Sequence, residues 1–184
     1  MPNRCMDAQW EKVMKKLIIV FALACMIGGA AYAQIPVHMD KGNLAVAAGV
    51  NFGWDYGFGG SIEYMFARVD IAESVPLTFG LAARAGVGFI YGTNYTVVGL
   101  ATLHWSLGFI SELPLWLKKF DFYYGLGLGI GAGSGFHVGI GNGGGVAYYI
   151  KPNLAIYSSV IYVRYFENSA GGSGFGSFGL IFKL

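Results

Sequence analysis

Two polar residues, His104 and Ser106, stand two positions apart in alternating sequence and are of the types that nucleophilic catalysis needs. A serine becomes a nucleophile when a base lies within hydrogen-bond reach and a third group orients that base. Alternation puts both side chains on one face of a strand, and Glu112 follows as the nearest acid. The simpler interpretation is that His104 and Ser106 are polar residues that fill an interior, and we expect no catalytic residue here.

Other motifs give weaker indications of chemistry. The histidines His38, His104 and His137 have no carboxylate at local ligand spacing, so no metal and no cofactor is expected. The stretch GIGNGGG at 139–145 matches a dinucleotide-binding glycine pattern, but no helical pattern follows it. The sequence therefore does not favour nucleotide binding.

The first 33 residues have the features of a cleavable signal peptide. Met14 is the expected true start; Lys15 and Lys16 follow it, then an apolar run and an Ala31-x-Ala33 cleavage pattern before residue 34. A membrane-anchoring helix or a lipoprotein modified at Cys25 are the alternatives. Without residues 1–33 the chain has 8 basic and 8 acidic residues and no cysteine. We therefore expect no nucleic-acid partner and no disulfide framework.

The composition of the 184 residues is unusual for a soluble protein. Apolar residues make up 55% and charged residues 12%, with 30 glycines and 12 tyrosines, whereas about a quarter of an ordinary soluble chain is charged. A period of two, which is typical of β-strands, recurs in eight segments. These segments cover 43–58, 61–67, 77–91, 95–107, 120–135, 136–150, 154–166 and 174–184.

The two faces of these segments differ in an unexpected way. In 120–135 one face is apolar and aromatic, whereas the other is mostly glycine. A soluble β-sandwich would need a charged outer face, which this chain lacks. The sequence therefore predicts an all-β fold, an eight-stranded antiparallel transmembrane up-and-down β-barrel over 34–184, with the apolar face toward lipid. A bulge is expected near 142–145, and the orientation of the seventh segment is ambiguous.

The predicted barrel assigns roles to several residues. An eight-stranded barrel has an interior just wide enough for side chains, and buried charges must pair. A polar network in the lumen is expected from Asp55, Glu63, Arg84, Asp121 and His137, with Arg164 as a further candidate. This network either plugs the barrel or gates a narrow pore. Aromatic residues at the membrane interfaces are expected to be Trp54, Tyr56, Tyr91, Tyr95 and Tyr165.

The chain resembles the small outer-membrane β-barrel superfamily of the OmpA, OmpX or porin-family type. The features that support this resemblance are AAYAQ at the end of the leader, the turn YYIKPNLAIYSSV and the C-terminal FGSFGLIFKL. The resemblance implies that Phe178, Leu180, Phe182 and Leu184 form the insertion signal read by the barrel-assembly machinery, with Leu184 where an aromatic is usual. It also implies periplasmic chaperones and outer-membrane lipids as partners.

The expected function is that of a monomeric outer-membrane barrel with a structural or surface role, minor permeability at most and no catalytic activity. Lipid A deacylases of the PagL type use a similar His-x-Ser arrangement. A membrane-embedded acyl hydrolase that uses His104, Ser106 and Glu112 is therefore the first alternative. A narrow pore is the second.

Overall fold

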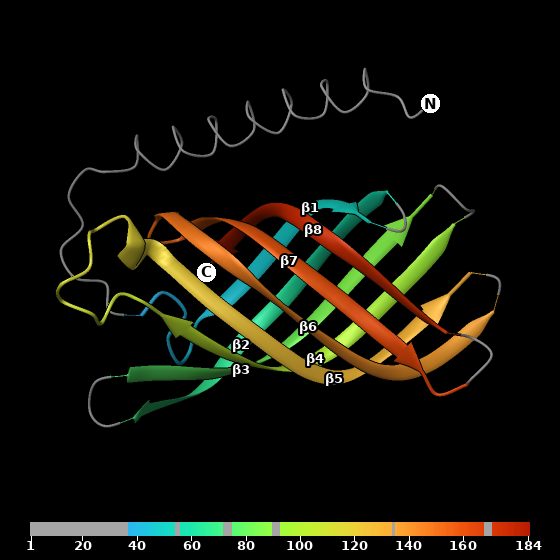
Figure 1. Ribbon diagram of the computed structural model, residues 1–184, viewed down its shortest axis with the longest axis horizontal. Coiled ribbons are helices and arrows are strands. Elements are labelled where there is room, and N and C mark those ends of the chain that lie inside the picture. Colours follow the sequence, from blue (N-terminus) through green and yellow to red (C-terminus); the bar gives the residue numbers. More distant parts are fainter. Residues whose placement is uncertain (1–36, 54–55, 72–74, 90–92, 134, 168–170) are drawn as a thin grey trace, which may run out of the picture.

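The chain folds into one closed barrel of eight antiparallel strands. The computed structural model describes residues 37–53, 56–71, 75–89, 93–133, 135–167 and 171–184. The strands pair in chain order, β8 pairs with β1, and all cross the barrel obliquely (Figure 1). They are β1 (Leu44–Phe52), β2 (Gly57–Ile71), β3 (Val75–Gly88), β4 (Asn94–Ser106), β5 (Phe120–Ala132), β6 (Phe136–Lys151), β7 (Leu154–Tyr165) and β8 (Gly172–Lys183), with a short 3-10 turn, η1 (Leu117–Lys119), before β5. The predicted fold class is confirmed.

The barrel has an apolar outside and a small or polar inside, as the alternation predicts. Large apolar side chains on the outer face are highly exposed, for example Leu81 at 60%, Leu128 at 63% and Val160 at 63%. The residues that alternate with them point inward and are small, polar or tightly packed. Such an exterior would be unfavourable in water and is the one that hydrocarbon requires. Among the described residues, no helix combines the length and apolar character needed to cross a membrane.

The boundary between the first two strands differs from the sequence prediction. The first strand was expected to run to residue 58, but β1 ends at Phe52 and Phe58 belongs to β2. Gly53 explains the break, because its φ of 123° is a backbone conformation that glycine adopts without strain. Alternation continues through 53–58 by coincidence, so a period of two did not reveal this turn.

The prediction of a bulge near 142–145 was wrong. Pairing of β6 is regular there, and the irregularities lie between Tyr149 and Lys151 and, in β2, between Met65 and Ala67. The glycines of 142–145 instead give room to neighbours: a Cβ on Gly145 would lie 2.6 Å from the hydroxyl of Tyr123.

The orientation of the seventh segment is clear in the structure. Tyr157, Ser159 and Ile161 of β7 point into the barrel, whereas Val160 and Arg164 are exposed outside. Arg164 therefore does not belong to a lumen network. The leader 1–33, its start Met14, and three site residues of the sequence prediction lie outside the described residues: Trp54, Asp55 and Tyr91.

Candidate functional site

The charged side chains described in the lumen gather near the barrel end where β1 begins and β8 finishes. Glu63 comes from β2, Arg84 from β3, His104 from β4 and Asp121 from β5. The register of β4 and β5 sets Ser106 opposite Asp121 and His104 opposite Tyr123. Inward-facing residues of four consecutive strands therefore meet at one level of the barrel, a group that we call the lumen cluster: Glu63, Arg84, Thr102, His104, Ser106, Asp121 and Tyr123.

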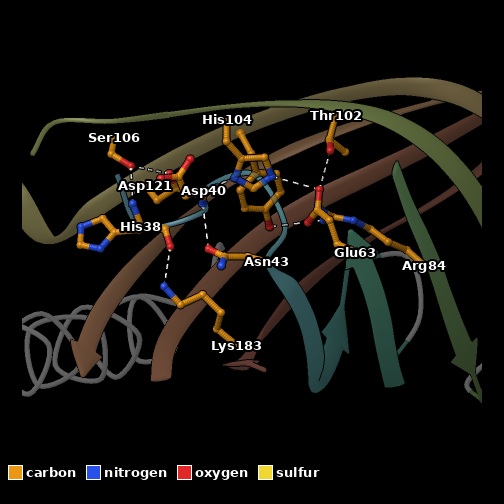
Figure 2. A network of polar contacts seen from close by, with 11 residues as sticks. His38, Asp40, Asn43, Glu63, Arg84, Thr102, His104, Ser106, Asp121 and Lys183 are labelled. Carbon is orange, nitrogen blue, oxygen red and sulfur yellow. Dashed lines mark hydrogen bonds and ion pairs between the residues drawn. The ribbon is translucent and has the colours of Figure 1, made fainter. Parts of the chain in front are cut away.

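His104 lies between two carboxylates at the centre of the lumen cluster (Figure 2). Its Nδ1 is 2.7 Å from Oδ2 of Asp121, and its Nε2 is 3.0 Å from Oε1 of Glu63. Ionised carboxylates only accept hydrogen bonds, so an imidazolium satisfies this geometry by donating from both nitrogens. Thr102 donates a further hydrogen bond of 2.5 Å to the same Glu63 oxygen.

Arg84 supplies the second positive charge of the lumen cluster. Its Nη2 is 3.6 Å from Oε2 of Glu63, and its Nη1 donates a 3.3 Å hydrogen bond to the hydroxyl of Tyr123. The guanidinium carbon also lies 4.6 Å from the centroid of the Tyr123 ring. Both carboxylates and Arg84 are buried, so the charges are balanced within one desolvated group, as burial requires.

The geometry does not assemble the catalytic triad that the sequence offered as an alternative. Ser106 donates to Oδ1 of Asp121 over 2.8 Å and accepts from the backbone N–H of His38 over 3.2 Å. Its hydroxyl is thus held by an acid rather than by a base, and the residue is 1% exposed. Glu112 is exposed in the β4–β5 connection, where it accepts a hydrogen bond from Ser111 over 2.6 Å. Ser106 and His104 share Asp121 instead, and Glu112 contacts neither.

His137 was predicted to join the lumen network, and this is wrong. It lies near the opposite end of the barrel, where its Nδ1 is 3.1 Å from Oε2 of the exposed Glu167. Alternation gives the face of a side chain but not its height in the barrel. Within the described residues, no group of three or more potential ligands of the His, Cys, Asp and Glu types has a metal-binding arrangement.

A segment before β1, residues 37–43, closes the barrel beneath the lumen cluster, and the sequence prediction missed it. We call it the docked segment. The ring of His38 stacks on Tyr149 with centroids 4.3 Å apart, and its Nε2 donates to the carbonyl of Lys118 over 2.7 Å. Lys183 donates from Nζ to the carbonyl of His38 over 2.8 Å. Burial lowers the pKa of His38, although the hydrogen bond to Lys118 opposes this. No periodic pattern in 34–43 indicated this role, and His38 was expected to lie outside the barrel.

Apolar side chains close the lumen on both sides of the lumen cluster. At the level of the docked segment, Met39 packs with Met65, Tyr149 and Tyr157. Toward the other end, five buried residues form what we call the apolar layer: Ala82, Val98, Leu100, Ile161 and Val163. The cavities between them are small, with volumes of about 20 and 10 Å³.

The structure places some of the predicted interface aromatics outside the barrel and one inside it. Tyr56 and Tyr95 are exposed by 61% and 54% on the outside. Tyr165 was predicted to face the interface, but it packs inside against the apolar layer, because β7 presents its odd-numbered residues to the lumen. The C-terminal residues proposed as the insertion signal all lie on the exposed outer face: Phe178, Leu180, Phe182 and Leu184.

Solved structures with the same architecture are numerous. The N-terminal β-barrel domain of Pseudomonas aeruginosa OprF matches with a TM-score of 0.53 and 16% identity over 78% of this chain and 98% of that domain. Ail, the attachment invasion locus protein of Yersinia pestis, matches with a TM-score of 0.53 and 15% identity over 79% of this chain and 100% of its own. The chain has the fold of the small outer-membrane β-barrels. Together, this fold and the apolar exterior are those of an outer-membrane protein.

Other comparisons add no functional argument. The outer membrane enzyme PagL matches with a TM-score of 0.43 and 14% identity over 77% of this chain and 98% of its own, which is too distant to bear on activity. No protein-family profile matches the sequence, and no curated protein sequence is significantly similar. Function must therefore be argued from the residues of this barrel.

Proposed function

We propose that this protein is an integral outer-membrane barrel with a closed lumen, a structural or surface role and no catalytic activity. The observation that carries the proposal is the apolar layer, whose five side chains are each at most 5% exposed. Beside Ile161 the remaining space is lined in part by Arg84, Ser159 and Ser177, and its volume of about 10 Å³ is that of about one water molecule. A hydrated ion does not fit, so such a constriction resists conduction. The lumen cluster then acts as an internal brace between β2, β3, β4 and β5.

The pore alternative has less support than the closed barrel. A conducting path needs continuous space, whereas the two cavities at the level of Arg84 have volumes of only about 20 and 10 Å³. The segment that carries His38 and Met39 also covers one end of the barrel. The charged groups of the lumen cluster form ion pairs with one another, which favours a brace over the lining of an open channel.

The acyl hydrolase alternative also lacks a supporting geometry. A hydrolase of membrane lipids needs a serine that substrate can reach and a base that takes its proton. Ser106 is buried inside the barrel, and its proton is directed to Asp121. We expect lipid A from cells that express the wild-type protein or Ser106→Ala to have the same acyl pattern in mass spectrometry.

Biogenesis would follow the usual path of such barrels. The outward row Phe178, Leu180 and Phe182 in the last strand suits recognition by the barrel-assembly machinery, after escort by periplasmic chaperones. Outer-membrane lipids would then cover the exterior of a monomeric barrel.

Ion conductance across planar bilayers tests the closed lumen. The wild-type protein is expected to add no conductance to that of the bilayer, whereas a variant with Val98→Gly and Ile161→Gly opens the apolar layer and conducts. The matched control replaces their outward neighbours, Val97→Gly and Val160→Gly, and remains closed. Wild-type conductance that changes on Arg84→Ala would contradict the proposal and favour the pore.

A further inference from the structure

The barrel end opposite the lumen cluster carries an open depression that the proposed function does not use. It has a volume of about 290 Å³ and lies above the apolar layer. We call it the mouth cup; the side chains that matter for its chemistry are those of Asn51, Thr96, His137, Tyr165, Ser173 and Phe175. These come from β1, β4, β6, β7 and β8, so the cup is a product of barrel closure rather than of one loop. Barrel mouths are a recurrent place for ligand sites.

Glycines in the wall of the mouth cup give its two aromatic rings fixed seats. A Cβ on Gly86 would lie 2.8 Å from the ring of Phe175, and a Cβ on Gly131 would overlap the hydroxyl of Tyr165. Both rings also pack against the apolar layer below. Since the rings are supported from the side and from beneath, they present pre-formed surfaces to the cup.

The polar groups of the mouth cup are held in place as well. Asn51 accepts from Ser177 over 2.7 Å and donates to the carbonyl of Phe58 over 2.8 Å. The hydroxyls of Thr96 and Ser173 share a hydrogen bond of 3.1 Å across the cup. His137 lies 5.1 Å from Tyr165, centroid to centroid, and is oriented by Glu167 outside the lining. The cup thus combines hydroxyl, amide and imidazole groups with aromatic faces.

Charge narrows the class of ligand. The described lining of the mouth cup contains no Lys, Arg, Asp or Glu, and a single imidazole, that of His137, is too little to hold a phosphate, a sulfate or a metal ion. An alkyl chain would use none of the hydrogen-bonding capacity that the side chains of Asn51, Thr96 and Ser173 keep beyond the bonds they already make. A neutral ring rich in hydroxyls suits both halves of the lining, because its hydroxyls pair with the polar groups and its C–H face covers an aromatic ring.

We infer that the mouth cup binds a small neutral carbohydrate of one or two sugar rings. Tyr165 and Phe175 provide the stacking surface, and Thr96, Ser173 and Asn51 provide the hydrogen bonds. The cup is at the lower end of the size range of small-molecule pockets, about 300–1,000 Å³, which excludes a longer chain of sugars from full enclosure. The inference is independent of conduction, because all the groups that would hold the sugar lie in the cup itself.

Isothermal titration of the full chain in lipid nanodiscs tests this inference. The probes are glucose, galactose, N-acetylglucosamine, maltose and lactose, with sucrose octasulfate as a charged comparison. At least one neutral sugar is expected to bind saturably. Tyr165→Ala should weaken that binding about tenfold or more, equivalent to about 1.4 kcal/mol, and the isosteric Thr96→Val should weaken it measurably without removing a packed ring.

Controls separate the mouth cup from other surfaces. Tyr124→Ala removes a tyrosine of β5 that is 52% exposed on the outside and does not line the cup, and it should leave sugar binding unchanged. The inference is overturned if none of the five neutral sugars binds, or if only the sulfated probe does. It is equally overturned if Tyr165→Ala and Thr96→Val bind as the wild type does, or if Tyr124→Ala weakens binding to the same extent.

Discussion

At the scale of single residues, the lumen cluster shows how a barrel interior accommodates charge. Glu63 accepts hydrogen bonds from Thr102 and His104 and pairs with Arg84, and Asp121 accepts hydrogen bonds from His104 and Ser106. Each carboxylate is therefore the meeting point of several donors from neighbouring strands. Removal of one such acceptor leaves its donors desolvated and unpaired, which costs more than the net benefit of the intact pair.

The variant Glu63→Gln tests this cost. It keeps the size of the side chain but removes the charge that faces Arg84 and His104, both of which stay buried. We expect the free energy of unfolding to fall by about 3 kcal/mol, measured by urea titration of tryptophan fluorescence in lipid vesicles. Glu112→Gln is the matched control, since Glu112 is exposed and outside the lumen cluster, and should change stability by less than about 0.5 kcal/mol. Equal stability of the two variants would refute the bracing role.

At the scale of elements, the segment before β1 is held to the barrel end by few contacts, centred on His38. The groups that face His38 are the Lys118 carbonyl, the Asp121 carboxylate, the ammonium groups of Lys183 and Lys119, and the stacked ring of Tyr149. Burial lowers the pKa of His38 below its usual 6.5 in the docked segment. Released from the barrel, His38 binds a proton more readily, so docking keeps its full stability above pH 6.5 and loses it as the pH falls toward the lowered pKa.

Thiol labelling measures this release. Val37→Cys, at a buried position that is only 8% exposed, is compared with the exposed Lys41→Cys in a chain whose Cys5 and Cys25 are replaced by alanine. Both thiols are labelled with a water-soluble methanethiosulfonate. The ratio of the labelling rate at Val37→Cys to that at Lys41→Cys is expected to rise as the pH falls below 6.5. His38→Phe keeps a ring on Tyr149 but cannot titrate, so its ratio should stay level. A wild-type ratio that is constant across this range would exclude His38 as the titrating group.

The strands also explain which parts of the site could be predicted. The period of two identified the inward faces of β2 to β5, so Glu63, Arg84, His104 and Asp121 were expected in the lumen. Height within the barrel depends on the register between strands, which the turns set and the period does not reveal. That is why His137, although inward, was grouped with residues at the far end.

Strand seven and the docked segment were beyond such reasoning for different physical reasons. Apolar or aromatic residues occur on both faces of β7, so the period was ambiguous and Tyr165 was assigned to the wrong side. The segment at 37–43 is not a strand and carries no period at all, and its position rests on contacts between residues distant in sequence, such as those of His38 with Lys118 and Lys183.

At the scale of the whole molecule, the protein reverses the arrangement of a soluble domain. Apolar and aromatic side chains cover the outside, whereas charge, hydroxyls and glycine occupy the inside. Closure removes every strand edge, which a barrel in hydrocarbon requires because unpaired backbone groups are costly there. The bracing by the lumen cluster, the closed lumen and the mouth cup all depend on this reversal.

Fluorescence quenching by brominated lipids tests the reversal directly. A bimane label on Val160→Cys, at a position 63% exposed in the middle of β7, is compared in vesicles with one on Lys41→Cys at the barrel end, both in the chain without Cys5 and Cys25. The label at Val160 is expected to be strongly quenched by bromine on the acyl chains and protected from aqueous iodide, and the label at Lys41 to behave oppositely. Aqueous iodide quenching at Val160 as strong as that at Lys41, with no effect of brominated lipid, would contradict the account.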